Sequence, residues 1–183
     1  AGLNYLFHSI VDDEQLSDIG EKVGADVPFC LHGGTMLAEG IGTILSPLPD
    51  IPPCFIVLAK PDIPVSTAQA YHKFDSLQEV AHPDFEDMSD AVCLQSLDEI
   101  GKYAANVFEQ SVEIPEIGRL KEIMLAFGAV GACMSGSGPT VNTLSRIPSQ
   151  LPEHASAPTK MLSTSAITNE SSILCQILFF AMF

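Results

Sequence analysis

Asp26 is the residue in this sequence best suited to acid–base chemistry, because it follows two small residues in Gly24-Ala25-Asp26. A carboxylate held in a fixed position can align a hydroxyl group and take its proton as the oxygen attacks. The two small residues allow a backbone turn that would present this carboxylate. The same pattern also suits a helix-end or turn carboxylate that local backbone amides satisfy. On the pattern alone, this second interpretation is favoured.

A glycine-rich segment, Ser135-Gly136-Ser137-Gly138-Pro139, is the second candidate. Because glycine has no Cβ, backbone N–H groups in such a segment can come close to an anion. Glycine-rich turns are also common as plain hairpin turns, so the segment alone is a weak signal.

Thr67 and Tyr71 form the third candidate group, one helical turn apart in a segment that Ser66 or Thr67 can cap. Tyr71 also suits a core aromatic beside Phe74, and Thr67 suits a helix cap. Thr67 could serve in both ways, so the pattern leaves these alternatives open.

The composition predicts a globular protein and excludes two kinds of partner. Of 183 residues, 46% are apolar and 17% are charged, which is enough apolar material for a packed core. Asp and Glu number 23 against 8 Lys and Arg, for a formal charge of −15. Such a chain repels the phosphates of nucleic acids and anionic membranes. We therefore expect a cytoplasmic protein that binds neither.

Cysteine and histidine spacing indicates neither a disulfide framework nor a metal site. No two cysteines have C-x-x-C spacing, and the histidines show no zinc-binding pattern. Free, buried thiols and no metal ligands are therefore predicted. The five cysteines are Cys30, Cys54, Cys93, Cys133 and Cys175.

Apolar spacing and turn residues predict a mixture of helices and strands. Residues 1–10 are predicted to be the end of a helix, and further helices are predicted over 13–23, 66–74, 86–108 and 114–127. Strands are predicted over 35–40, 43–45, 54–59 and 129–134, with a proline-rich linker over 47–53.

The pattern changes after Val141. Residues 142–183 contain four charged residues, eleven Ser or Thr and three prolines, without periodicity. They end in an apolar run over 173–183, shorter than the roughly 20 residues that span a bilayer. We predict a divergent tail, buried or prone to aggregation, and hypothesise a reading-frame shift or a wrongly joined coding segment near Val141.

Three stretches, in their order and spacing, together resemble the CDP-methylerythritol kinases of the GHMP superfamily. They are residues 23–42, residues 58–71 and residues 131–141, and the resemblance covers about residues 1–141. It implies an α/β, two-layer (α+β) GHMP kinase fold. The implied domains are a remnant of the ribosomal-protein-like first domain over 1–48, a ferredoxin-like second domain over 49–141, and the divergent tail over 142–183.

The resemblance also implies an activity, which is ATP-dependent phosphorylation of the 2-hydroxyl of CDP-methylerythritol in the non-mevalonate isoprenoid precursor pathway. ATP and Mg²⁺ would be required, and the location would be the cytoplasm, or the stroma in a plastid-bearing organism. Asp26 matches the catalytic aspartate. Thr67 and Tyr71 match the cytidine pocket, where an aromatic ring stacks on the base for about 1–3 kcal/mol. Gly136, Ser137 and Gly138 match the turn beside the phosphates.

Some features of the family find no match in this sequence. The family's phosphate loop and catalytic lysine are expected before Ala1, so the chain alone is expected to be inactive. The segment 106–109 is assigned to packing. Two other functions stay open, namely a non-catalytic module that binds cytidine nucleotides and another GHMP kinase acting on a different small alcohol. The sequence does not indicate an oligomeric state.

Overall fold

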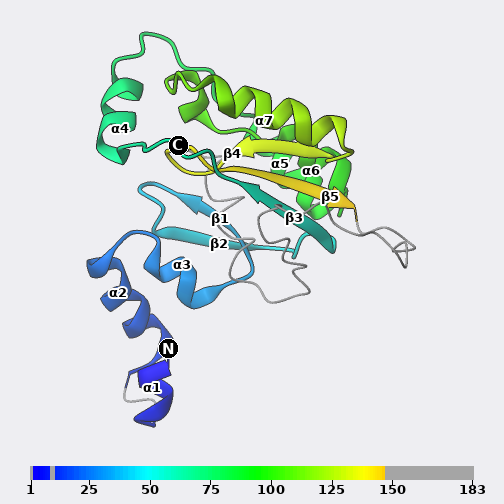
Figure 1. Cartoon of the computed structure of the whole chain (residues 1–183). Helices are drawn as coiled ribbons and strands as arrows, with labels where there is room; N and C mark the ends of the chain where they lie inside the picture. The colour runs from blue at the N-terminus through cyan, green and yellow to red at the C-terminus, as the bar shows by residue number, and fades with distance from the viewer. Residues whose placement is uncertain (1, 9–10, 147–183) are drawn as a thin grey trace.

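The computed structural model describes residues 2–8 and 11–146, arranged as helices packed with two small antiparallel sheets (Figure 1). The first part of the chain contains α1 (Gly2–Leu6), α2 (Asp13–Val23), α3 (Val27–His32), β1 (Thr35–Glu39) and β2 (Ile44–Leu48). The second part contains β3 (Cys54–Ala59), α4 (Thr67–Asp75), α5 (Phe85–Cys93), α6 (Leu97–Tyr103), the 3₁₀ helix η1 (Val107–Gln110), α7 (Pro115–Ala126), β4 (Gly131–Met134) and β5 (Val141–Arg146).

The second part is built on a three-stranded antiparallel sheet of order β3-β5-β4. The central strand β5 pairs Val141 with Ala59 on one side and with Met134 on the other. Helices α6 and α7 pack against β4 and β5. The close approach of α6 depends on glycine, since a Cβ on Gly101 would lie 2.4 Å from the carbonyl oxygen of Val130.

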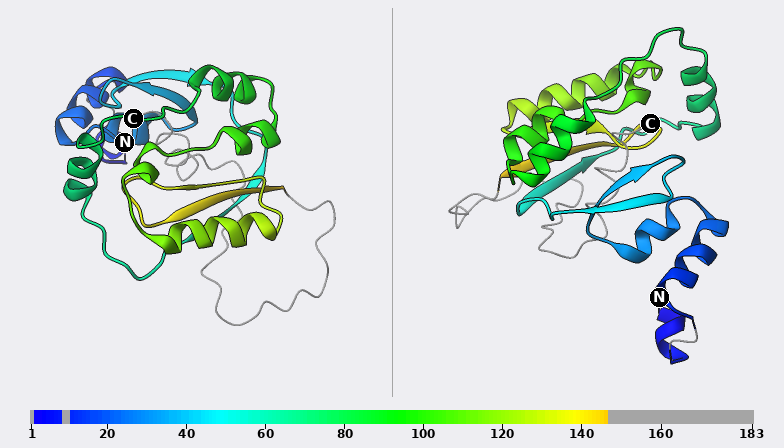
Figure 2. Two further views of the ribbon diagram at one scale, coloured as in Figure 1. Left: turned by 90° about the horizontal axis from the view of Figure 1, so that it is seen from above. Right: turned by 180° about the vertical axis from the view of Figure 1, so that it is seen from behind.

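The β1–β2 hairpin lies beside α5, and α1–α3 lie beyond the hairpin (Figure 1 and Figure 2). Strand β2 contains Pro47, which pairs with Met36, although 47–53 was predicted to be a linker. Proline is tolerated there because a two-stranded ribbon has only edge strands. Strand β2 contacts α5, which connects the hairpin to the second part of the chain.

Two clusters of buried side chains form most of the core. One joins the β3–β5 side of the sheet to α5 and α6, and contains Ile51, Cys54, Ile56, Met88, Ala91, Val92, Ile100 and Leu144. The other lies among α4, η1, α7 and the β4–β5 turn, and contains Ala70, Val107, Phe108, Ile117, Met134 and Val141. A third, smaller cluster in the first part has Phe29 and Ala38 as its buried members.

Several predicted elements are confirmed with their end signals. Helix α2 matches the predicted 13–23, and Asp12 and Gln15 form a capping box at its start. Strand β3 matches 54–59. Helix α7 begins at Pro115 and is followed by Gly128 with φ 93°, as expected for a helix stop.

The single helix predicted over 86–108 is wrong. Gln95 has a positive φ of 57° between α5 and α6, and Ser96 caps the new helix by accepting from Glu99 N. Asn106 then begins η1. The apolar period continued across these breaks because each of the separate helices buries apolar residues in one of the two larger clusters.

Strand β5 crosses the position where the tail was predicted to begin. Residues 141–144 are buried and paired on both sides, and the strand ends at Arg146. The change of composition at residue 142 is therefore no break in the sheet, although it does place polar side chains in its centre. The rest of the predicted tail and Cys175 lie outside the described residues, and the domain limits stay a prediction.

The four cysteines in the described part of the chain are free thiols. Cys54 and Cys133 are buried as predicted, whereas Cys30 and Cys93 are exposed, which corrects the expectation of buried thiols. Both exposed thiols belong to short helices, of which only one face packs inward. None of the helices in the described ranges combines the length and the apolar character needed to cross a bilayer.

Candidate functional site

The start of α4 shows that Ser66, rather than Thr67, caps this helix. Ser66 is the N-cap, and its hydroxyl accepts from Gln69 N at 3.4 Å. The Thr67 hydroxyl instead lies 3.0 Å from the Ser137 hydroxyl, close enough for a hydrogen bond that either group can donate. The structure therefore brings together two residues that are 70 positions apart and were predicted separately.

The β4–β5 turn carries Ser137 in a conformation that needs glycine on both sides. Gly136 has φ 58° and Gly138 has φ 85°, and a Cβ on Gly138 would lie 2.7 Å from the sulfur of Met134. Ser135 N donates to Thr140 O at 2.7 Å, and Gly138 N donates to Ser135 O at 3.0 Å. Gly138–Pro139 is a cis peptide bond.

Two amides of this turn can face a ligand. Within residues 2–8 and 11–146, the N–H groups of Gly136 and Ser137 have no acceptor. Adjacent free amides next to a left-handed residue form a concave surface that suits an anion. The N–H of Gly138 donates to Ser135 O within the turn and is not free. Of the three residues predicted to contact phosphates, only Gly136 and Ser137 therefore have a free N–H within the described residues.

Tyr71 follows Thr67 by one turn of α4, and its ring packs partly in the core, which is one of its two predicted roles. One edge of its ring packs against Phe108, with centroids 4.8 Å apart and planes at 75°. The side chain nevertheless remains 42% exposed. It is therefore supported from within the core while part of its surface stays open to a flat ligand.

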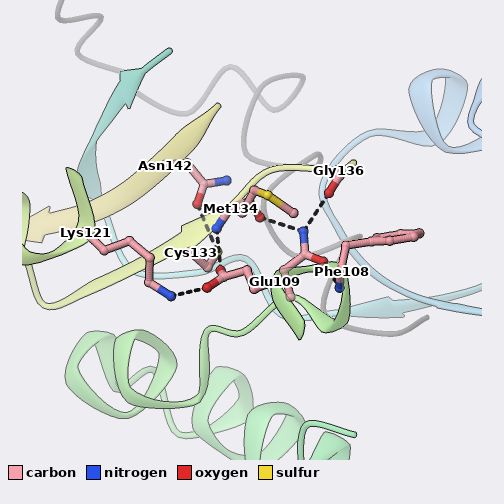
Figure 3. Close-up of polar contacts among 8 residues, drawn as sticks. Phe108, Glu109, Lys121, Cys133, Met134, Gly136 and Asn142 are labelled. Carbon is pink, nitrogen blue, oxygen red and sulfur yellow. Dashed lines mark hydrogen bonds and ion pairs between the residues drawn. The ribbon is translucent and has the colours of Figure 1, made fainter. Parts of the chain in front are cut away.

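The segment 106–109 supports both walls of this site, which the sequence analysis did not anticipate. The side-chain Nδ2 of Asn106 donates to the carbonyl oxygens of Met134 and Gly136, each at 2.8 Å (Figure 3). Its Oδ1 accepts from Phe108 N at 2.9 Å. Asn106 is only 5% exposed. The sequence signal that could have indicated this role is one amide side chain flanked by the apolar pairs Ala104-Ala105 and Val107-Phe108.

Glu109 holds the strand that leads into the turn. Its Oε1 accepts from Met134 N at 2.7 Å, and its Oε2 forms an ion pair with Lys121 of α7. The neighbouring thiol of Cys133 donates to Asn142 Oδ1 at 3.0 Å. Burial, followed by the negative charge of Glu109 and opposed by Lys121, raises the pKa of Cys133 to about 12. This thiol therefore stays protonated at neutral pH.

Asp26 lies in the first part of the chain, at the N-cap of α3. Its carboxylate is exposed and makes no capping hydrogen bond, so the alternative of a carboxylate satisfied by local amides is not observed. Among the described residues, no hydrogen bond or ion pair joins Asp26 to α4 or to the β4–β5 turn. The structure thus joins the Thr67–Tyr71 helix to the Ser137 turn, while Asp26 belongs to a separate element.

Residues 2–8 and 11–146 contain no group of three or more His, Cys, Asp or Glu side chains able to hold a metal ion.

Comparison with known proteins gives kinases as the relatives of this chain. Residues 88–157 match the family model described as "GHMP kinases C terminal". A 4-diphosphocytidyl-2-C-methyl-D-erythritol kinase (CDP-methylerythritol kinase) from Geobacillus kaustophilus is 45% identical over 142 residues, which is 76% of this chain and 49% of that enzyme. The chain is homologous to the CDP-methylerythritol kinases. It spans about half the length of the curated relatives it matches.

Solved structures confirm the GHMP kinase fold and its α+β class. A crystal structure of 4-(cytidine 5′-diphospho)-2C-methyl-D-erythritol kinase matches with a TM-score of 0.63 and 29% identity, over 78% of this chain and 51% of that one. A homoserine kinase from Cytophaga hutchinsonii matches with a TM-score of 0.64 and 22% identity, over 80% of this chain and 52% of that one. This second likeness concerns the fold alone.

Proposed function

We propose that this chain contributes the acceptor-substrate side of a small-molecule kinase site that takes CDP-methylerythritol and supports transfer of a phosphoryl group from ATP to its 2-hydroxyl. The observation that carries the proposal is the 3.0 Å contact between the hydroxyls of Thr67 and Ser137. It makes one continuous surface from two segments that matched different parts of the family pattern.

Each group at this surface has a role that suits its chemistry. The open face of Tyr71 would stack on the cytosine ring, because a base presents a flat π-face. The hydroxyls of Thr67 and Ser137 would bind polar edges of the nucleotide. The free amides of Gly136 and Ser137 would face the negatively charged diphosphate.

Asp26 would act on the acceptor. A bare, exposed carboxylate at the N-cap of a short helix can orient a hydroxyl group and take its proton during phosphoryl transfer. This role requires that substrate connects Asp26 to the Thr67–Ser137 surface, since no direct hydrogen bond does so among the described residues.

ATP and Mg²⁺ belong to the proposal as phosphoryl donor and counter-ion. Magnesium is commonly held by one or two carboxylates together with substrate phosphates, and the carboxylate of Asp26 is a ligand of that type. When bound, ATP supplies the phosphoryl group and Mg²⁺ neutralises charge that develops on it.

A non-catalytic module that binds cytidine nucleotides is the second candidate function. It is favoured by the difference between the well-supported Tyr71 surface and the separate position of Asp26. A kinase for another small alcohol has less support, because likeness to homoserine kinase is confined to the fold at 22% identity.

The test is calorimetric titration of the full 183-residue chain with CDP-methylerythritol, mevalonate and homoserine, alongside an assay for ATP-dependent phosphorylation. The proposal predicts binding of the cytidine compound in preference to the other two, and weaker binding in Tyr71→Ala. Tyr5→Ala is the matched control, because Tyr5 is 85% exposed on α1.

The outcomes separate the candidates. Binding of the cytidine compound that Asp26→Asn weakens, or turnover that it abolishes, supports the kinase, because Asp26 must then reach the acceptor. Binding that Asp26→Asn leaves unchanged, without turnover, supports the module, and equal affinity for all three compounds would reject both cytidine-based functions.

A further inference from the structure

The 3₁₀ helix η1 and its N-cap contact both segments of the candidate site, which are α4 and the β4–β5 turn. Asn106 at its start holds the β4–β5 turn through the carbonyl oxygens of Met134 and Gly136. Phe108, two residues later, supports the ring of Tyr71 and also packs against Phe74, with centroids 5.2 Å apart. The position of α4 relative to the β4–β5 turn therefore depends on one short element.

The amide of Asn106 is fully used in this arrangement. Both hydrogens of Nδ2 are donated to carbonyl oxygens at 2.8 Å, and Oδ1 accepts from Phe108 N at 2.9 Å. A side chain with three such bonds and 5% exposure has very little rotational freedom. Asn106 can therefore transmit the position of η1 to the turn.

The bond to Gly136 also determines which way the next amide points. In a trans peptide the carbonyl oxygen and the following N–H lie on opposite sides of the bond. Because the Gly136 carbonyl points toward Asn106, the N–H of Ser137 points away from η1. This is one of the two free amides that suit an anion.

A second hydrogen bond from η1 holds β4 through the backbone N–H of Met134. Glu109, also on η1, accepts from Met134 N at 2.7 Å, while Asn106 donates to Met134 O. Asn106 and Glu109 thus bind both backbone polar groups of Met134. The orientation of the turn after Met134 therefore depends on the bond from Asn106 to the carbonyl oxygen of Gly136 (Figure 3).

We propose that Asn106 is a positioning residue for the nucleotide site, which sets the Ser137 amide and hydroxyl against Thr67 and Tyr71 so that they bind a cytidine diphosphate together. This inference rests on the proposed function. It adds a residue that does not touch the ligand and acts only through the turn.

The experiment uses Tyr71 as the reporter of the pocket. The chain has three tyrosines and no tryptophan, so Tyr5→Phe with Tyr103→Phe leaves Tyr71 as the one fluorescent side chain of the full chain. In this background, cytidine 5′-diphosphate is titrated against the parent protein, Asn106→Ser and Asn106→Asp. Ser and Asp keep an oxygen that can cap Phe108 N, whereas both lack the amide Nδ2 whose two hydrogens bond Met134 O and Gly136 O.

Gln110→Ala is the matched control on the same element. Gln110 forms two hydrogen bonds, to Ala81 N and Ala81 O at 2.9 and 2.8 Å, on a side of η1 that does not contact the turn. We expect both Asn106 variants to bind cytidine diphosphate about tenfold more weakly, and Gln110→Ala to stay within about twofold of the parent. Equal losses in all three variants would overturn the proposal, because Asn106 would then act only through stability.

Hydrogen exchange without ligand separates this inference from the proposed function. The amides of Ser135 and Gly138, which are bonded within the turn, are expected to exchange about tenfold faster in Asn106→Ser, while amides of the β1–β2 hairpin are unchanged. If the parent protein does not bind cytidine diphosphate but this pattern appears, the proposed function fails and the positioning of the turn stands. Unchanged exchange at both amides would reject the positioning role.

A measurement on the unmutated protein covers the case in which a variant does not fold. The two Nδ2 protons of Asn106 are expected to be protected from exchange with solvent, because both are bonded in a buried position. Free exchange of these protons would overturn the inference.

Discussion

Asp26 begins a helix whose core cluster has two buried members, Phe29 and Ala38. Thr67, Tyr71 and Ser137 are instead positioned by a sheet and four surrounding helices with two larger clusters, in which Phe108 is 1% exposed. The first part of the chain also exposes several large apolar side chains, which are Tyr5, Leu6, Phe7, Ile19, Val23, Ile41 and Ile44.

This difference shows which side of the proposed site is already organised. Local opening is easiest where few apolar contacts hold a segment, and hardest in a dense core. The Thr67–Ser137 surface, formed by α4 and the β4–β5 turn, is therefore expected to be rigid in the absence of ligand. The carboxylate of Asp26 is expected to depend on weaker packing for its position.

The largest expected effect is on Phe108. Phe108→Ala should destabilise the protein by about 3–5 kcal/mol, because it removes a fully buried ring from the second cluster. Phe29→Ala should cost less in the same unfolding transition, since it mainly loosens the first part of the chain. Urea denaturation followed by circular dichroism measures both. Equal losses would mean that the two parts are equally well packed.

The exposed and the buried thiols should differ in reactivity and in their effect on stability. Cys30 is exposed and should react with a maleimide at pH 8, whereas Cys133 is buried with its pKa raised to about 12 and should not. Because the folded pKa lies above the ordinary value of 9.0, the unfolded chain loses this proton first as the pH rises.

Stability is therefore present in full below about pH 9 and is lost toward pH 12, by about 1.4 kcal/mol per pH unit for one such thiol. Cys133→Ala should flatten this part of the pH profile, and urea denaturation at several pH values measures it. Burial also raises the pKa of Cys54, so a smaller slope should remain. A profile that Cys133→Ala leaves unchanged would count against the account of this thiol.

Two buried asparagines sharpen the same comparison within the sheet region. Asn106 uses all of its polar atoms, whereas Nδ2 of Asn142 has no partner among the described residues, at 1% exposure (Figure 3). Asn142→Val should therefore stabilise the protein by about 1 kcal/mol, because it removes an unsatisfied buried donor. Thermal unfolding with Asn106→Ser as the contrasting variant tests this, and a loss of stability in Asn142→Val would contradict it.

Much of the fold could be predicted from local signals in the sequence. The predicted helix 13–23 and the apolar run 54–59 both match elements of the structure. The breaks inside 86–108 could not be predicted from period alone, because Gln95 adopts a positive φ that only its surroundings determine. The exposed positions of Cys30 and Cys93 likewise depend on which helix face packs inward.

The site divides in the same way. Residue type and resemblance selected Thr67, Tyr71 and the turn 136–138, and the structure brings Thr67 and Ser137 into contact. Ser66, and not Thr67, caps α4, with its hydroxyl 3.4 Å from Gln69 N. The sequence alone does not distinguish these two residues as caps. The role of Asn106 was missed because its partners Met134 and Gly136 lie 28 and 30 positions away.

A double-mutant cycle on Thr67 and Ser137 tests directly whether α4 and the β4–β5 turn form one nucleotide site. Affinity for CDP-methylerythritol is measured for the parent chain, Thr67→Val, Ser137→Ala and the double variant. The account predicts a coupling energy above about 0.5 kcal/mol, because the two hydroxyls contact each other and the same ligand. Strictly additive effects, or binding that neither variant changes, would contradict it.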